Sequence, residues 1–278
     1  MVIKSYSKIN LTLKVNSRTK SGLHEIQTFY SWINLIDKIN INKIKKKKDR
    51  ISFKGPFAKL VKNKNNTVNK LLKRLRELNL ISSYYSIVIT KNIPVFSGLG
   101  GGTSNAAFIL KYLLKNKINI SLLNKIEELI GSDFKLFFNN QGYLKNLGKI
   151  IGFKKRHNFC FVLIQPKIKC STKNIYSSVK NFSVKENLNK KMMKSKNTFL
   201  DYLTKSRNDL QFIVERKYPS IKSLLIDINN EKGCYFSRMT GSGSVCYGLF
   251  IDQFFAKKAL NKLKIKYPKF WFSLAKTV

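Results

Sequence analysis

Four glycines stand within five positions in PVFSGLGGGTSNAA, residues 94–107. An apolar strand pattern (YSIVIT, residues 85–90) comes before them, and an apolar helix pattern (NAAFILKYLL, residues 105–114) follows. Glycines at such a junction let successive backbone N–H groups approach an anion, and the helix N-terminus adds its dipole. The segment therefore predicts a phosphate-binding loop. A flexible linker is the alternative, although linkers do not normally join an apolar strand to an apolar helix.

This loop differs from the two best-known nucleotide-binding motifs. No Gly-Lys-Ser or Gly-Lys-Thr follows it, as a Walker loop requires, and no strand-associated acid lies about 20 residues further on, as in a dinucleotide fingerprint. Thr103 and Ser104 supply hydroxyls for phosphate oxygens or a metal-bound water. The residues expected to contact the nucleotide here are Pro94, Gly98, Leu99, Gly100, Gly101, Gly102, Thr103 and Ser104.

The composition allows one or two packed cores, because the chain has 278 residues, of which 43% are hydrophobic. No apolar run is long enough to cross a bilayer and the N-terminus has no apolar signal core, so we expect a cytoplasmic protein. The four cysteines are scattered without a CxxC pair, which argues against a zinc site.

The net charge of +40 is the feature that favours a nucleic-acid-binding protein. Basic residues nevertheless occur along the whole chain, with denser runs only at residues 43–50 and 190–196. Asn and Ile are abundant too, as an AT-rich coding sequence would produce, and arginines do not cluster with aromatics. We therefore expect no nucleic-acid partner. The positive field would instead attract anionic small molecules such as nucleotides.

Alternating strand and helix patterns indicate a mixed architecture, class α+β, in two lobes. Strand patterns lie at residues 5–15, 85–90, 159–164 and 245–250, and helix patterns at residues 66–80, 105–114, 121–130, 208–216, 221–228 and 253–264. Residues 5–15 alternate, which predicts one half-buried strand with a polar face. Ser121 is the expected cap and Gly131 the expected end of the helix at residues 121–130.

The pattern restarts near residue 150, which predicts a domain boundary between residues 153 and 154. Residues 180–197 are polar and lysine-rich, and we expect an exposed loop or a frayed helix there.

The glycine loop resembles the phosphate-binding motif of the GHMP kinases, the superfamily of galactokinase, homoserine kinase and the mevalonate-pathway kinases. Further segments are similar to that family and occur in its order: SKINL at residues 7–11, GLHEIQT at 22–28, NDL at 208–210 and RMTGSGS at 238–244. The resemblance covers almost the whole chain. It implies an ATP-binding domain at residues 1–153 that is like ribosomal protein S5, and a ferredoxin-like, substrate-side domain at residues 154–278.

Within the family, the segments look closest to those of enzymes that phosphorylate a cytidine-diphosphate-linked polyol in non-mevalonate isoprenoid synthesis. The resemblance implies ATP as co-substrate and Mg²⁺ with the nucleotide, and we expect a monomer or weak homodimer. Kinases of the same superfamily that act on mevalonate, homoserine or a sugar are the alternative.

Asp133 and Lys8 are the expected catalytic pair. Asp133 follows the helix end at Gly131, so its carboxylate should project from a loop; the similar family segment carries the proposed catalytic base. Lys8 lies on the polar face of the first strand, where its ammonium could stabilise that carboxylate and the developing alkoxide. The alternatives are a helix cap for Asp133 and a solvated side chain for Lys8.

The resemblance also assigns the binding residues. Those on the substrate side are Asn10, His24, Tyr176, Thr240, Gly241, Ser242 and Gly243, and those on the adenine side of the nucleotide are Asn65 and Lys91. His24 would hydrogen-bond the cytosine and Tyr176 would stack on it. A satisfied loop histidine, a core tyrosine and a plain tight turn at residues 240–243 are the alternatives.

Four residues depart from the family pattern. Leu23 replaces a tyrosine, which removes a stacking partner, and Lys135 replaces a proline. Asn146 and Lys149 stand where relatives tend to have glycine and glutamate. No carboxylate stands out as a magnesium ligand, so phosphates and water would hold the ion.

Overall fold

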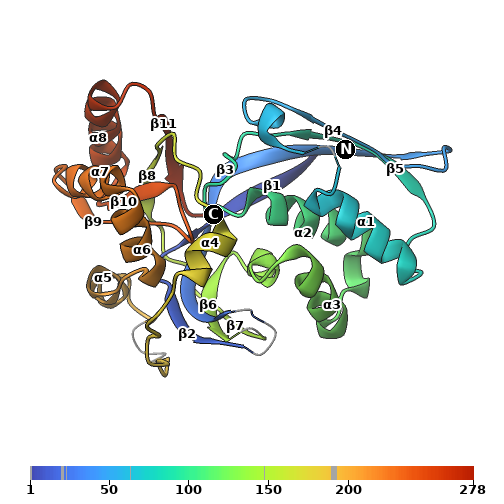
Figure 1. Ribbon diagram of the computed structural model, residues 1–278, viewed down its shortest axis with the longest axis horizontal. Coiled ribbons are helices and arrows are strands. Elements are labelled where there is room, and N and C mark those ends of the chain that lie inside the picture. Colours follow the sequence, from blue (N-terminus) through green and yellow to red (C-terminus); the bar gives the residue numbers. More distant parts are fainter. Residues whose placement is uncertain (1, 20–21, 23, 63, 147, 189–192) are drawn as a thin grey trace. The chain divides into compact units, whose positions relative to one another are not determined.

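The computed structural model describes residues 2–19, 22, 24–62, 64–146, 148–188 and 193–278. The chain forms two compact units, each built from several segments. The first unit contains residues 1–8, 35–95 and 100–139, and the second contains residues 9–34, 96–99 and 140–278. Figure 1 shows the elements of each unit under the labels used below.

The first unit combines strands with three α-helices and three short 3₁₀ helices, labelled η, among its described residues. It contains parts of β1 (Val2–Asn10) and β3 (His24–Ile44), then β4 (Arg50–Lys54), η1 (Ala58–Leu60), α1 (Thr67–Glu77), β5 (Tyr84–Thr90), α2 (Gly101–Leu114), η2 (Lys115–Lys117), α3 (Ile120–Ile130) and η3 (Phe134–Phe138). β5 pairs antiparallel with the C-terminal half of β3 and parallel with β4. α1 contacts both α2 and α3, and these helices lie together in Figure 1.

The second unit holds a four-stranded antiparallel sheet with the order β11-β8-β10-β9. Its strands and helices are β8 (Cys160–Gln165), α4 (Thr172–Ser177), α5 (Lys196–Lys205), α6 (Asp209–Lys217), α7 (Pro219–Asn229), β9 (Cys234–Met239), β10 (Cys246–Phe250), α8 (Gln253–Lys266) and β11 (Trp271–Lys276). α7 packs on β9 and β10, α8 packs on β8 and β11, and the two helices touch. One face of the sheet is therefore covered by both helices, which is the predicted ferredoxin-like arrangement.

Three more strands of the second unit pair around the N-terminal half of β3. These are β2 (Lys14–Arg18), β6 (Gln141–Asn146) and β7 (Lys149–Gly152). β2 and β6 pair antiparallel with β3, and β7 pairs with β6. Asn146 and Lys149, two of the departures from the family pattern, face each other in the β6–β7 hairpin.

Most predicted elements are present with shifted ends. The predicted helix at residues 121–130 does end at Gly131, but its N-cap is Asn119, whose side chain accepts from the Leu122 N–H, so the Ser121 cap was wrong. Residues 179–188 form neither helix nor strand, as expected of the connector, whereas α5 begins at Lys196, inside the range predicted as loop.

The predicted strand at residues 5–15 is corrected in two ways. β1 ends at Asn10 and β2 begins at Lys14, because the Leu11 N–H turns to the carbonyl of Phe29. The predicted polar face is also buried: Lys8 is 1% exposed and Asn10 1% exposed. The strand therefore holds polar groups that need partners inside the protein.

No helix of the described ranges is long and apolar enough to span a membrane. The predicted boundary between residues 153 and 154 concerns the family domains and stays a prediction.

Candidate active site

The first turn of α2 lies at the end of the glycine loop. The helix begins at Gly101, one turn before its predicted start, and its N-cap Gly100 has φ 72° and provides no side-chain cap. The leading N–H groups of a helix have no acceptor within the helix, so this end favours an anion. A Cβ on Gly100 would lie 2.9 Å from Cζ of Phe137 and 3.3 Å from Cε of Lys8. Glycine at this position therefore lets the lysine stem pass directly beside the helix end.

Lys8 and Asp133 form an ion pair in the first unit. The distance from Lys8 Nζ to Asp133 Oδ2 is 3.0 Å, and the side chains are 1% and 34% exposed, respectively. The lysine is thus not a solvated surface residue. Asp133 precedes η3 but makes no side-chain cap hydrogen bond, so the helix-cap alternative does not describe its carboxylate. The structure brings the two predicted catalytic groups together, with the ammonium enclosed and the carboxylate partly open to solvent.

A second buried ion pair lies behind the same helix turn. Lys91 is ion-paired with Asp37, and their side chains are 3% and 0% exposed. Asp37 also accepts from the backbone N–H groups of Asn92 and Ile93, at 2.8 and 2.9 Å. Lys91 Nζ lies only 3.2 Å from where a Cβ on Gly101 would be. The sequence predicted Lys91 as a site residue but not Asp37. The one sequence feature that could have indicated Asp37 is that acidic residues are rare in this basic chain.

The start of α1 is joined to the start of α2. Thr67 donates its hydroxyl to the carbonyl of Gly102 over 2.7 Å. The preceding Asn66 caps α1 by accepting from two backbone N–H groups, while Asn65 is exposed with φ 61°. Asn66 and Thr67 were not predicted as site residues, although an Asn-Thr pair before an apolar helix pattern is a recognisable capping signal.

Ser104 supports the glycine loop from inside. Its hydroxyl donates to the carbonyl of Tyr6 over 2.5 Å and lies 2.7 Å from the hydroxyl of Ser5. It is fully buried. The hydroxyl therefore already has partners within the protein, and of the two predicted hydroxyls we keep only that of Thr103 in the proposed phosphate site.

Lys135 has a buried acidic partner. Its Nζ lies 2.6 Å from Oε2 of Glu127, and the side chains are 5% and 13% exposed. Burial raises the pKa of Glu127; Lys135 opposes that rise and the charge of Asp133 adds to it. This ion pair ties η3 to α3 immediately after Asp133.

In the second unit, residues 96–98 pack against the loop at residues 240–245. Ser244 and Val245 donate their N–H groups to the carbonyls of Phe96 and Ser97, at 3.0 and 3.2 Å. A Cβ on Gly98, where φ is 75°, would lie 2.0 Å from the carbonyl oxygen of Thr240. Only glycine fits there, so the two glycine-rich segments depend on each other.

The loop at residues 240–243 is also held by side chains. Asn208 donates to the carbonyl of Gly241 over 2.8 Å, and the Ser242 hydroxyl lies 3.0 Å from that of Thr172. The N–H of Gly243 donates to the carbonyl of Thr240, as in a tight turn. Asn10 donates its N–H to the Thr240 hydroxyl over 3.0 Å. Its side chain donates to the hydroxyl of Thr28 over 2.9 Å.

His24 and Tyr176, the predicted base-binding residues, lie together in the second unit. Their ring centroids are 5.1 Å apart, and the ring of Phe182 lies 6.4 Å from that of His24. Burial and the nearby charge of Arg18 lower the pKa of His24, so the imidazole is neutral at neutral pH. Phe182 was missed from the sequence because an isolated phenylalanine in a polar connector gives no pattern. Leu23 lies outside the described residues.

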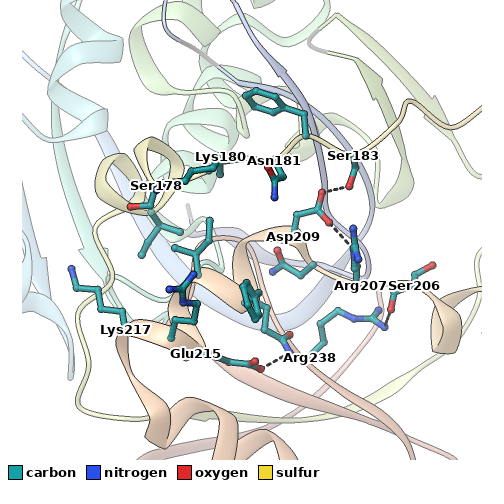
Figure 2. Close-up of a pocket in the computed structure, with 18 of the residues that line it drawn as sticks. Ser178, Lys180, Asn181, Ser183, Ser206, Arg207, Asp209, Glu215, Lys217 and Arg238 are labelled. Atoms are coloured by element: carbon teal, nitrogen blue, oxygen red, sulfur yellow. Dashed lines mark hydrogen bonds and ion pairs between the residues drawn. The ribbon is translucent and has the colours of Figure 1, made fainter.

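A cavity of about 1120 Å³ also lies in the second unit (Figure 2). Its wall includes Ser178–Ser183, Arg207–Asp209 and part of α6. Figure 2 shows Asp209 linked to Ser183 and to Arg207. No predicted site residue is among those that the structure places in this wall.

Comparison with known proteins shows the family to which the chain belongs. The family models for the GHMP kinases N terminal domain and the GHMP kinases C terminal region match residues 66–133 and 184–269. The chain is 38% identical to a 4-diphosphocytidyl-2-C-methyl-D-erythritol kinase of Pelagibacter ubique (strain HTCC1062), across 99% of this chain and 98% of that one. This chain belongs to the 4-diphosphocytidyl-2-C-methyl-D-erythritol kinase family of GHMP kinases.

Further relatives support the assignment. The enzyme of the same name from Clostridium botulinum (strain Langeland) is 31% identical across 97% of this chain and 98% of its own length. A crystal structure of 4-(cytidine 5'-diphospho)-2C-methyl-D-erythritol kinase matches with a TM-score of 0.74 at 22% identity, across 99% of both chains. The predicted α+β GHMP kinase fold is confirmed. As a member of this family, the chain is an ATP-dependent phosphotransferase.

Proposed function

We propose that the chain transfers the γ-phosphoryl group of ATP to the 2-hydroxyl of 4-diphosphocytidyl-2-C-methyl-D-erythritol. The products are the 2-phosphate and ADP, and the reaction belongs to the non-mevalonate route to isopentenyl diphosphate. The observation that carries the proposal is the Lys8–Asp133 ion pair beside the uncapped first turn of α2. The names of the full-length relatives supply the substrate.

Asp133 is proposed as the base. The substrate oxygen forms a bond to the γ-phosphorus as the bond from that phosphorus to the bridging oxygen breaks, and ADP leaves with the electron pair. The hydroxyl proton passes to the Asp133 carboxylate, which is 34% exposed and so can meet a substrate. Lys8 is proposed to pair with that carboxylate and to stabilise negative charge on the attacking oxygen.

The first turn of α2 is proposed to hold the polyphosphate. Gly100, Gly101 and Gly102 bring backbone close to the phosphates, and the helix dipole adds to the charge of Lys8. Among the described residues, no cluster of His, Cys, Asp or Glu is fit to hold a metal ion. We therefore propose that Mg²⁺ arrives with ATP and is held by phosphates, water and the Thr103 hydroxyl. The predicted nucleotide roles of Asn65, Pro94 and Leu99 are kept as part of this proposal.

The cytosine is proposed to bind at His24 and Tyr176. A neutral imidazole donates at one nitrogen and accepts at the other, so it matches the edge of a pyrimidine without taking part in proton transfer. Asn10 and the loop at residues 240–243 are proposed to orient the rest of this substrate. The predicted monomer or weak homodimer, the cytoplasmic location and the lack of a nucleic-acid partner also stay predictions.

The test is a comparison of acceptors in an ADP-coupled assay. We expect turnover with the cytidine-diphosphate-linked methylerythritol and none above background with mevalonate, homoserine or galactose. Phosphorus NMR of the product should show a new phosphomonoester on the tertiary 2-hydroxyl. Faster turnover of any of the other acceptors would contradict the substrate assignment while leaving the kinase assignment intact.

A further inference from the structure

The rings of His24, Tyr176 and Phe182, in the second unit, support a further assignment, which rests on the proposed function. We propose that Phe182 is a nucleobase-binding residue: with Tyr176 and His24 it forms the aromatic site for the cytosine ring. The geometry that points to it is the placement of the Phe182 ring 6.4 Å from His24, whose ring lies 5.1 Å from that of Tyr176.

Phe182 has the exposure of a binding residue. Its side chain is 45% exposed, although burying a phenyl group is worth about 2–3 kcal/mol. An exposed aromatic ring beside a neutral histidine and a second aromatic ring offers a planar apolar surface and a hydrogen-bonding edge together. That combination suits a flat heteroaromatic ligand, because bases stack on aromatic rings whatever their sequence context.

The segment that carries Phe182 is fixed in place by its next residue. Ser183 donates its N–H to the carbonyl of Val15 over 2.8 Å and its hydroxyl to Asp209 over 2.7 Å, a contact visible in Figure 2. Its carbonyl accepts from the side chain of Asn16 over 2.9 Å. Every polar group of Ser183 is therefore bonded to a neighbouring element.

A second fixed point lies four residues after Phe182. Glu186 exchanges two hydrogen bonds with the Gln27 side chain, from its own N–H over 2.8 Å and to its own carbonyl over 3.0 Å. Its carboxylate contacts Lys14 at 2.9 Å and accepts from the Tyr202 hydroxyl over 2.6 Å. These contacts hold the pKa of Glu186 below its ordinary value despite partial burial.

The two fixed points, Ser183 and Glu186, hold the backbone that follows Phe182 before any ligand binds. Because this backbone is already held, stacking on the ring costs little backbone conformational freedom. The sequence offers one further argument: position 23, where the family pattern has an aromatic residue, is leucine in this chain. Phe182 supplies the stacking surface that Leu23 does not.

The experiment compares Phe182→Ala and Phe182→Trp with wild type in full steady-state kinetics. We expect Phe182→Ala to raise the KM for the cytidine-linked substrate about five- to tenfold and to leave kcat and the KM for ATP unchanged. Phe182→Trp should keep the KM within about twofold of wild type. Phe254→Ala, which removes another exposed phenylalanine of the same unit, is the matched control and should change nothing.

A rescue variant and a binding measurement separate a binding role from a structural one. Leu23→Tyr in the Phe182→Ala background should recover most of the lost affinity, which a structural defect would not allow. Calorimetric titration with cytidine 5'-diphosphate should show the same weakening as KM. An unchanged KM in Phe182→Ala, with an active wild type, would overturn this inference alone. A wild type that neither turns over the substrate nor binds cytidine 5'-diphosphate would overturn the proposed function and this inference with it.

Discussion

The two units hold candidate functional groups of different kinds. In the first unit the groups are charged: the ion pairs Lys8–Asp133 and Lys91–Asp37 lie beside and behind the first turn of α2, and of these four side chains Asp133 alone is partly exposed. In the second unit they are rings, His24 with Tyr176 and Phe182. Charged side chains can stabilise the charge that develops in the transition state of phosphoryl transfer. Aromatic rings bind the cytosine, which the reaction leaves unchanged, and so contribute equally to the ground state and the transition state. Variants in the first unit should therefore lower kcat, and variants in the second should raise KM.

Among the variants that compare the two units, replacing Lys8 gives the largest effect. Lys8→Met removes the ammonium and keeps the length of the side chain, so we expect kcat to fall about 10²- to 10³-fold, as when one stabilising donor of a transition state is lost. Lys4→Met, which changes an exposed lysine of the same strand, is the control and should retain full activity. A Lys8→Met enzyme with an altered KM for the cytidine substrate and a normal kcat would contradict the expectation that variants in the first unit lower kcat.

Gly100→Ala tests the contact between the helix end and the lysine. The new Cβ would meet Phe137 and the stem of Lys8, and the residue would keep a left-handed conformation that costs about 1–2 kcal/mol. We expect kcat to fall about 10- to 100-fold because the ammonium is displaced. Gly148→Ala, where a Cβ has nothing within 4 Å, should behave as wild type in the same assay.

Lys135→Met tests how the turn after Asp133 is held. Glu127 already has a raised pKa, so its ionisation disfavours the folded state, and losing its cation should raise that pKa further. The folded variant then binds more protons than the unfolded chain, and its stability falls as the pH rises above about 4.3, the ordinary value.

We expect a loss of about 1–3 kcal/mol in urea unfolding near pH 8 and a smaller loss near pH 5. Lys73→Met removes a lysine that is 82% exposed in its pair with Glu77, and it should change stability by less than about 0.5 kcal/mol. A loss for Lys135→Met that is independent of pH would contradict the role of Glu127.

The smallest expected effect is the pH dependence that His24 gives to substrate binding. Because its pKa is lowered by burial and by Arg18, the ring stays neutral down to a pH below about 6.5. The KM for the cytidine substrate should be flat from about pH 8 to that point and should rise about two- to fivefold below it. His24→Asn should abolish the rise. A KM that already increases between pH 8 and pH 7 would contradict a neutral His24.

The helices and the catalytic pair could be predicted from the sequence for different reasons. Apolar spacing located α1, α2, α3, α6, α7 and α8, and Gly131 located the end of α3, whereas α4 and α5 were not predicted. The approach of Lys8 to Asp133 has no local signal in a chain this rich in lysine, and only the order of the family segments suggested it. Burial of the polar face of β1 could not be predicted, because it depends on partners such as Thr240, which bonds Asn10 from far along the chain.

The residues that the sequence did not predict share one physical cause. Asp37 is paired with Lys91, and Phe182 lies beside His24, through contacts between segments that are distant in sequence. β3 was missed because its first half is buried on both faces, so residues 26–33 show no alternation. Periodicity reports one exposed face, and it reports nothing where tertiary contacts cover both.

The most direct measurement of the central claim is single-turnover transfer of the γ-phosphoryl group of ATP in Asp133→Asn, with enzyme in excess over the cytidine-linked substrate. The amide keeps the shape of the carboxylate and removes its capacity to accept a proton. We predict a transfer rate about 10²- to 10⁴-fold below that of wild type, with the affinities for both substrates within about threefold. A transfer rate equal to that of wild type would show that the group beside Lys8 is not the base and would contradict the account.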